Sequence, residues 1–177
     1  MKMRKKVLVG LVCALALCMS FVLVGCGGDN FKYKDMDATQ VTQSLKDAGL
    51  PIEEIKTYTE ENDPNGLVGR PNGYTSKSGF VDSSQLDKYN SMIEFEEKCG
   101  NGDSSIAVEP RNYGGTVEVF ANEEDCKKRA EYLETLSSSG AAFLAEYSYR
   151  NKNVLLRLVK EITPDDAAKY EEIFMSE

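Results

Sequence analysis

Few residues in this 177-residue chain combine the types and the spacing that catalysis requires. The chain has no histidine, which removes the usual general base near neutral pH and the commonest ligand of transition metals. Ser76-Lys77-Ser78-Gly79 places hydroxyls next to an amine, as in serine–lysine enzymes. Neighbouring residues of a strand point to opposite faces of a sheet. Segment 74–81 is predicted to be extended, so Ser76 and Lys77 cannot act together.

Carboxylates are the other candidates for chemistry. Two acids on either side of a sugar can hydrolyse a glycoside. The chain has many acids, among them Glu94, Glu96, Glu97 and Glu109. This abundance singles out no pair, because charged runs usually form solvated surfaces. We therefore expect no catalytic residue.

A metal site is also not expected. Oxygen ligands suited to calcium gather around one turn, at Glu60, Glu61, Asn62, Asp63 and Asn65. Their spacing is not that of an EF-hand, and the Asn-Asp-Pro-Asn-Gly turn explains them without a metal. The sequence therefore predicts neither a metal nor another cofactor.

Aromatic and basic residues near the C-terminus indicate a binding surface. Tyr147 and Tyr149 alternate along a predicted strand and so share one of its faces. Arg157 belongs to the next predicted strand, and we expect it to lie beside them in a binding face. Tyrosine and arginine are residue types that often anchor a partner. The alternative is that both tyrosines close the edge of the core with their hydroxyls in water.

The N-terminus has the pattern of an export signal. Basic residues are followed by an apolar run of 18 residues, Val7 to Val24, and no acid occurs before Asp29. A basic segment, an apolar segment and small residues at its end are typical of a signal peptide. A retained transmembrane helix is the alternative, because the run is nearly long enough to span a bilayer.

The end of the apolar run favours the signal peptide. Leu23-Val24-Gly25-Cys26 resembles the lipobox of bacterial lipoproteins. The resemblance implies a diacylglyceryl group on the Cys26 thiol and signal-peptidase cleavage between Gly25 and Cys26. Two acyl chains hold a protein on a membrane stably. We therefore expect a signal peptide over 1–25 and a lipidated Cys26 with a flexible tether over 26–38. S-diacylglyceryl-Cys26 would anchor the chain to the outer face of the cell membrane.

Cleavage after Gly25 would leave a strongly acidic chain. The full chain has 21 basic and 29 acidic residues, and loss of four basic residues leaves 17 against 29, so the formal net charge changes from −8 to −12. An acidic domain repels nucleic acid, and no nucleic-acid partner is expected. Besides Cys26, the mature chain keeps Cys99 and Cys126. They form either one disulfide, which an exported compartment permits, or two separate buried thiols.

Residues 39–177 are predicted to form a single α+β domain, in which helices pack mainly on one face of an antiparallel sheet. Helical periodicity favours helices over 39–48, 83–99, 122–136 and 163–174, although part of 83–99 also suits a strand. Strand patterns occur over 52–61, 74–81, 116–121, 143–150 and 154–160. The order helix, strand, turn, strand occurs twice, over 39–81 and 123–160, which suggests a duplicated unit.

Three segments of this domain carry a second resemblance. Their sequences are GRPNGY at 69–74, GGTVEVF at 114–120 and NVLLRL at 153–158. They are similar to segments of small surface lipoproteins of Gram-positive bacteria. Those proteins have no assigned activity. The resemblance therefore implies a place on the cell envelope and a compact domain, but no chemistry.

These patterns favour a lipid-anchored extracytoplasmic lipoprotein whose non-catalytic domain binds an envelope protein or a cell-wall component. The alternative is a small cell-envelope hydrolase or modifying enzyme that uses carboxylates. A deep cleft with two facing acids would favour the enzyme, and a shallow sheet face with tyrosines would favour binding. A solute-binding subunit of a transporter is disfavoured, because two-lobed receptors usually need a longer chain. The sequence does not predict the oligomeric state.

Overall fold

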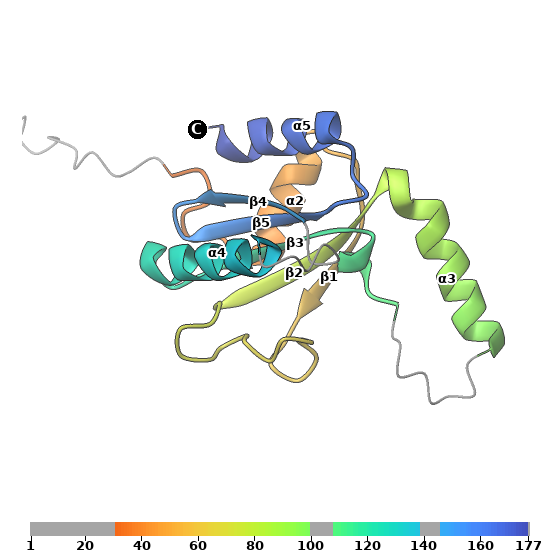
Figure 1. Cartoon of the computed structure of the whole chain (residues 1–177), viewed down its shortest axis with the longest axis horizontal. Coiled ribbons are helices and arrows are strands. Elements are labelled where there is room, and N and C mark those ends of the chain that lie inside the picture. Colours follow the sequence, from red (N-terminus) through yellow and green to blue (C-terminus); the bar gives the residue numbers. More distant parts are fainter. Residues whose placement is uncertain (1–30, 100–107, 139–145, 177) are drawn as a thin grey trace, which may run out of the picture. The chain divides into compact units, whose positions relative to one another are not determined.

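The computed structural model describes residues 31–99, 108–138 and 146–176 (Figure 1). The predicted signal peptide, Gly25, Cys26 and the first part of the tether lie outside the described residues. The chain divides into unit 1–32 and a compact unit, Tyr33–Glu177, to which all the elements below belong. Within the described ranges, no helix is both long and apolar enough to cross a membrane.

The compact unit is built on a five-stranded antiparallel sheet with the strand order β1-β2-β3-β5-β4. The strands are β1 (Ile52–Tyr58), β2 (Ser76–Asp82), β3 (Gly114–Val119), β4 (Glu146–Asn151) and β5 (Val154–Val159). The helices are α2 (Ala38–Asp47), α3 (Leu86–Cys99), α4 (Glu123–Ser138) and α5 (Pro164–Met175), with short 3-10 helices η1 (Ser83–Gln85) and η2 (Pro110–Asn112). The predicted α+β class with an antiparallel sheet is confirmed.

Local signals in the sequence set where the helices begin. The Asp37 side chain accepts a hydrogen bond from the Gln40 backbone in a capping box at the start of α2. The Thr163 side chain caps α5, whose first residue is Pro164. The ambiguous segment 83–99 is helical as η1 and α3, and the Asp82 side chain caps η1 by accepting from the Ser84 backbone.

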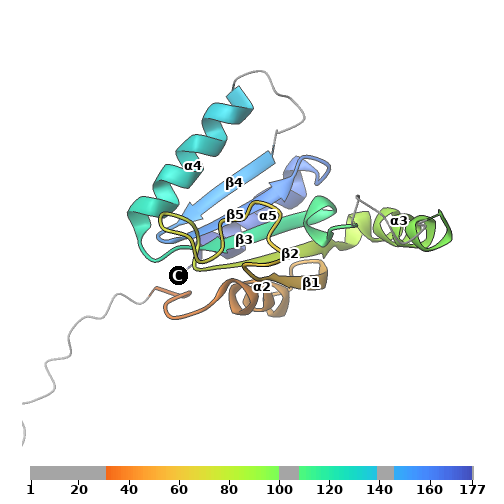
Figure 2. The ribbon, with the colours of Figure 1, turned by 90° about the horizontal axis from the view of Figure 1, so that it is seen from below.

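The sheet presents two different faces, and α2 and α4 lie on opposite sides of it (Figure 2). On the first, here called the α2–α5 face, Ser78 bonds to Thr42 of α2, and Phe80 stacks on Tyr170 of α5. The other, here called the α4 face, carries Lys77 and the other odd-numbered residues of β2, since side chains alternate along a strand.

The α4 face is covered by one helix and by the long loop 59–75 between β1 and β2. Buried residues from the sheet, the loop and α4 form an apolar cluster there, consisting of Tyr58, Val68, Tyr74, Phe120, Cys126 and Leu155. Leu67, Ala130 and Leu133 pack against its edge. The loop is therefore part of the fold and not a loose connection.

The folded unit begins earlier than the sequence predicts. Tyr33 is 1% exposed, its ring stacks on Phe174 of α5 with 5.4 Å between centroids, and its hydroxyl donates to the Phe174 carbonyl at 3.1 Å. The predicted flexible tether over 26–38 is therefore wrong for 33–38. Tyr33 is a single aromatic residue outside any periodic pattern. Its contact with Phe174, 141 residues away in the sequence, therefore could not be predicted from local sequence.

Candidate functional site

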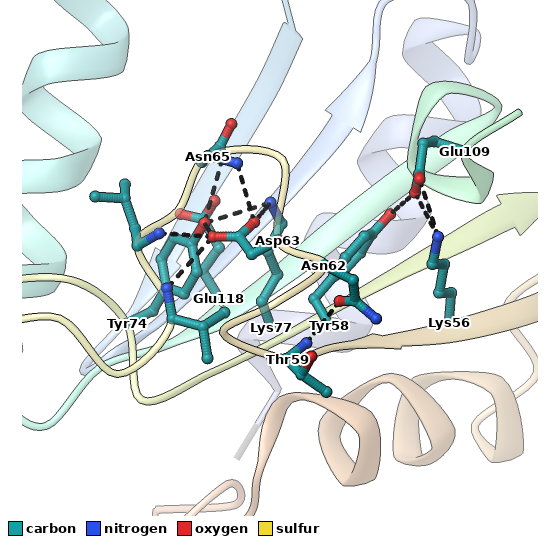
Figure 3. A network of polar contacts seen from close by, with 12 residues as sticks. Lys56, Tyr58, Thr59, Asn62, Asp63, Asn65, Tyr74, Lys77, Glu109 and Glu118 are labelled. Atoms are coloured by element: carbon teal, nitrogen blue, oxygen red, sulfur yellow. Dashed lines mark hydrogen bonds and ion pairs between the residues drawn. The ribbon is translucent and has the colours of Figure 1, made fainter. Parts of the chain in front are cut away.

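A buried ion pair organises the loop on the α4 face. The Lys77 ammonium donates to the Asp63 carboxylate at 2.8 Å, and neither side chain is exposed at all. The same carboxylate accepts from the Tyr74 hydroxyl at 2.7 Å and the Leu67 backbone at 2.8 Å. Figure 3 shows Asp63 surrounded by these donors. Because every bond is internal, the carboxylate holds loop 59–75 on the sheet.

The pKa values of this pair follow from its surroundings. Burial alone would raise the pKa of the Asp63 carboxyl, but hydrogen bonds from Lys77 and Tyr74 outweigh it and hold the pKa well below its usual range. Burial lowers the pKa of Lys77, although Asp63 partly opposes this. The Lys77 ammonium also lies 4.9 Å from the centroid of the Tyr58 ring, a cation–π contact that helps to replace water.

A second charged cluster lies beside the first on the same face. Glu118 is fully buried and accepts from Arg157 at 2.9 Å and from Arg129 of α4 at 3.2 Å. Arg157 also donates to both oxygens of Glu146, at 2.7 and 2.8 Å. These bonds tie α4 to β3, β4 and β5. Each guanidinium nitrogen of Arg157 therefore donates to a protein carboxylate.

A third polar cluster consists of Glu109, Tyr58 and Lys56. Glu109 accepts from the Tyr58 hydroxyl at 2.7 Å and from Lys56 at 2.9 Å, also shown in Figure 3. Burial alone would raise the pKa of Glu109, but these bonds lower it. Glu109, which sequence reasoning named among the candidate acids, thus has a structural role.

A cavity of about 320 Å³ opens between α4 and the sheet. Its lining includes Arg111, Thr116, Leu133, Leu136, Glu146 and Arg157. Arg111 differs from Arg157, because within the described ranges its side chain has no hydrogen bond or ion pair. Its Nε atom is shielded from solvent and has no partner. This cavity is the candidate functional site.

The predicted binding face of Tyr147, Tyr149 and Arg157 is wrong as a single surface. Strand register pairs Arg157 with Ser148 and pairs Tyr147 with Leu158. Since alternate residues face opposite sides, both tyrosines lie on the α2–α5 face while Arg157 lies on the α4 face. The tyrosines are half-buried, which agrees with the alternative that they close the edge of the core.

Of the two alternatives for Cys99 and Cys126, the disulfide is not formed, and both thiols are free. Cys126 is a residue of α4 and is fully buried in the apolar cluster, whereas Cys99 is exposed at the end of α3. Burial raises the pKa of the Cys126 thiol to about 12, so it is no nucleophile at neutral pH. The alternative of two separate thiols holds, although only Cys126 is buried.

The other candidates from the sequence do not converge on a site. Ser78 bonds to the Ala38 carbonyl on the face opposite Lys77, which confirms that the serines and Lys77 cannot act together. Of the oxygen groups considered as calcium ligands, the Asp63 carboxylate is bonded to Lys77, and the Asn62 side chain accepts from the Thr59 backbone. Within the described ranges, no three His, Cys, Asp or Glu side chains form a group that could hold a metal.

Sequence reasoning missed Arg111 and the Asp63–Lys77 pair. The turn around Asp63 was predicted, but nothing local shows that its carboxylate points inward. Lys77 has a weak signal, because a lysine that shares a strand face with an apolar residue such as Val81 must either reach solvent or find a buried partner. Arg111 follows a proline in a short connection and has no signal.

Comparison of the chain with models of protein families, with curated proteins and with solved structures gave no match. The lipobox and the resemblance to Gram-positive surface lipoproteins therefore stay predictions from the sequence.

Proposed function

We propose that this chain is a lipid-anchored extracytoplasmic lipoprotein whose domain binds a ligand, without catalysis, in the cavity between α4 and the sheet. The observation that carries the binding role is the contrast between two arginines in one lining. Each guanidinium nitrogen of Arg157 donates to Glu146 or Glu118, whereas the buried Nε of Arg111 has no hydrogen-bond partner among the described residues. A charged group kept half-buried without a partner is best explained by a ligand that supplies one.

The reactive groups near the cavity support binding and not catalysis. Both oxygens of Glu146 accept from Arg157, the Cys126 thiol is buried, and the Lys77 ammonium is enclosed by Asp63 and two tyrosine rings. A general base or nucleophile must reach the substrate, and none of these groups does.

The anchor rests on the sequence of residues 1–26. Replacing Cys26→Ser should leave an unlipidated, uncleaved precursor, because serine has no thiol to carry the diacylglyceryl group. Metabolic labelling with a fatty acid and mass spectrometry of the N-terminus measure both effects. A variant that is still cleaved after Gly25 and still retained on membranes to the same extent would contradict the anchor.

In-cell crosslinking tests the binding role. A photo-crosslinking residue at Asn112, which lines the cavity and is exposed, should capture a specific envelope component. The matched control is the same residue at Lys169, exposed on α5. Identical capture patterns at both positions would speak against a ligand in the cavity.

One observation bears on the alternative of a carboxylate-dependent envelope hydrolase: Glu146 and Glu161 line the same cavity. If the protein is such an enzyme, the purified chain should cleave cell-wall fragments, and Glu161→Gln should abolish cleavage. We expect no cleavage by either protein. Cleavage that depends on Glu161 would replace the binding role with the enzymatic one.

A further inference from the structure

We infer that the cavity takes a small oxyanion with an apolar group attached, and that Arg111 binds its carboxylate or phosphate. This inference rests on the proposed function and names the ligand class for the same site. It follows from three features of the lining: an unpaired guanidinium, a neighbouring free hydroxyl and an apolar wall.

The unpaired guanidinium comes first. A buried donor without a hydrogen bond costs about 1–3 kcal/mol, and more when the group is charged. The Nε of Arg111 is shielded from water without an acceptor, and within the described ranges its outer nitrogens have no acceptor either. Because Arg111 lines the cavity, we infer that these nitrogens donate to an incoming anion. A guanidinium binds planar or tetrahedral oxyanions through two parallel bonds.

The local charge also favours an anion. The charged residues of the lining are Arg111, Arg157, Lys160, Glu146 and Glu161. They carry one net positive charge in a chain whose formal net charge is −8. Arg157 is already paired with its acids, and Lys160 is exposed to water. The attraction for an anion is therefore concentrated at Arg111. Its guanidinium also interacts electrostatically with Glu109, which lies outside the lining, but that carboxylate is already bonded to Tyr58 and Lys56.

The backbone beneath Arg111 fixes its place. A Cβ at Gly79 would lie 3.0 Å from both the Arg111 Cβ and the Tyr58 ring, so glycine lets both side chains lie directly on the sheet. Thr116 is the partner of Gly79 in the strand register and lines the cavity. Its hydroxyl has no bond to any described residue. Arg111 and Thr116 thus form a polar end with free donors.

The opposite wall is apolar. Leu133 and Leu136 lie one turn apart on α4, line the cavity and are half-buried. The volume of about 320 Å³ is at the lower limit of small-molecule sites, about 300 Å³. A ring or a short alkyl chain next to the oxyanion fits these dimensions and can pack against the leucines, which a bare inorganic ion cannot do.

Phenyl phosphate is a suitable probe, since it is soluble and combines both groups. Its affinity is measured by calorimetry with the full lipidated chain in lipid nanodiscs, against empty nanodiscs. We expect it to bind more tightly than inorganic phosphate, which lacks the ring, and than benzyl alcohol, which lacks the charge. A parallel titration with 3-phenylpropionate shows whether a carboxylate or a phosphate is preferred.

Variants assign the binding to Arg111. Arg111→Gln should weaken the affinity by about tenfold or more, the value of a hydrogen-bonded charge. Thr116→Val keeps the shape and should weaken it by about fivefold, since one neutral hydrogen bond is lost. The control is Arg70→Gln, which removes an equal charge from an exposed position in loop 59–75 and should leave the affinity unchanged.

Two results would overturn the inference: equal affinity of Arg111→Gln and the parent chain, or binding of benzyl alcohol as tight as that of phenyl phosphate. Failure of the proposed function looks different. If Cys26→Ser shows no anchor while phenyl phosphate still binds through Arg111, the ligand class stands and the anchoring falls. If crosslinking captures a component at Asn112 but Arg111→Gln binds normally, the site stands and its ligand is no oxyanion.

Discussion

The two faces of one sheet are stabilised by different means. On the α2–α5 face, aromatic and aliphatic side chains from two helices meet the strands, as in the stack of Phe80 on Tyr170 at 5.9 Å. Its polar contacts include the Thr42–Ser78 hydroxyl pair at 2.6 Å and the bond from the Tyr170 hydroxyl to the Asp82 carboxylate at 2.7 Å, and none of these is an ion pair. On the α4 face, one helix and one loop are held by three acids and three bases, namely Asp63, Glu118, Glu146, Lys77, Arg129 and Arg157.

The difference shows what each kind of contact does. Apolar burial is non-directional and stabilises in proportion to area, so it suits a face that two helices cover. Ion pairs require fixed geometry, and they hold a loop that has few apolar residues of its own. The cavity lies on the charged face, where coverage is incomplete. Stability should therefore come mainly from the α2–α5 face, and binding specificity from the α4 face.

The largest expected effect comes from breaking the buried pair. Asp63→Asn leaves the Lys77 ammonium buried without its counter-ion and should destabilise the domain by about 3–5 kcal/mol. Adding Lys77→Met removes the stranded charge, so the double variant should be more stable than Asp63→Asn alone. Urea unfolding of the parent chain, Asp63→Asn, Lys77→Met and the double variant measures this. Strictly additive losses would show that the two residues are not coupled.

On the α2–α5 face, truncation of a buried side chain should destabilise the domain independently of the Asp63–Lys77 pair. Leu156 is fully buried, and Leu156→Ala should lower the free energy of unfolding by about 2–5 kcal/mol by leaving a cavity. The loss should be the same in the Asp63→Asn/Lys77→Met background, because the two sites lie on opposite faces. Calorimetric or urea unfolding gives both values. A strong dependence on background would contradict the separation of the faces.

Acid should weaken the charged face first. The folded-state pKa of Asp63 lies below its usual range, and the unfolded value is about 3.9. The pair therefore stabilises fully above that value, and the contribution is lost as the pH falls below it toward the folded pKa. Stability should decline less steeply in the Asp63→Asn/Lys77→Met variant than in the parent chain. Urea midpoints between about pH 6 and about pH 3 test this, and parallel curves would contradict it.

The smallest effect concerns the start of the folded unit. Tyr33→Phe keeps the ring stacked on Phe174 and removes only the hydroxyl that donates to the Phe174 carbonyl. It should cost about 1 kcal/mol, the net value of one hydrogen bond. Hydrogen exchange at the last turn of α5 should rise in parallel. No change in either measurement would mean that the tether extends past Tyr33, as the sequence predicts.

The two segments with the same order of elements occupy the two sides of the sheet around its central strand. The segments α2-β1-β2 and α4-β4-β5 flank the central strand β3, and their helices lie on opposite faces, as Figure 2 shows. The order was predictable because periodicity and turn residues are local. Whether the two segments arose by duplication stays a hypothesis, since their sequences share no residue pattern.

The local features of this protein follow from the sequence alone. Caps at Asp37 and Thr163 begin their helices, and alternation gives each strand two faces. These depend on neighbours along the chain, so they can be inferred without a fold. For the same reason the N-terminal pattern predicts an anchor at Cys26.

Which faces meet depends on long-range packing. Arg157 is separated from Tyr147 and Tyr149 because the register pairs it with Ser148, and a shift by one residue would move it to the other face. The Asp63 carboxylate points inward because Lys77 and Tyr74 donate hydrogen bonds to it there. The unsatisfied Nε of Arg111 exists for the same reason: long-range packing placed this side chain beside a cavity, and no described residue accepts a hydrogen bond from it there.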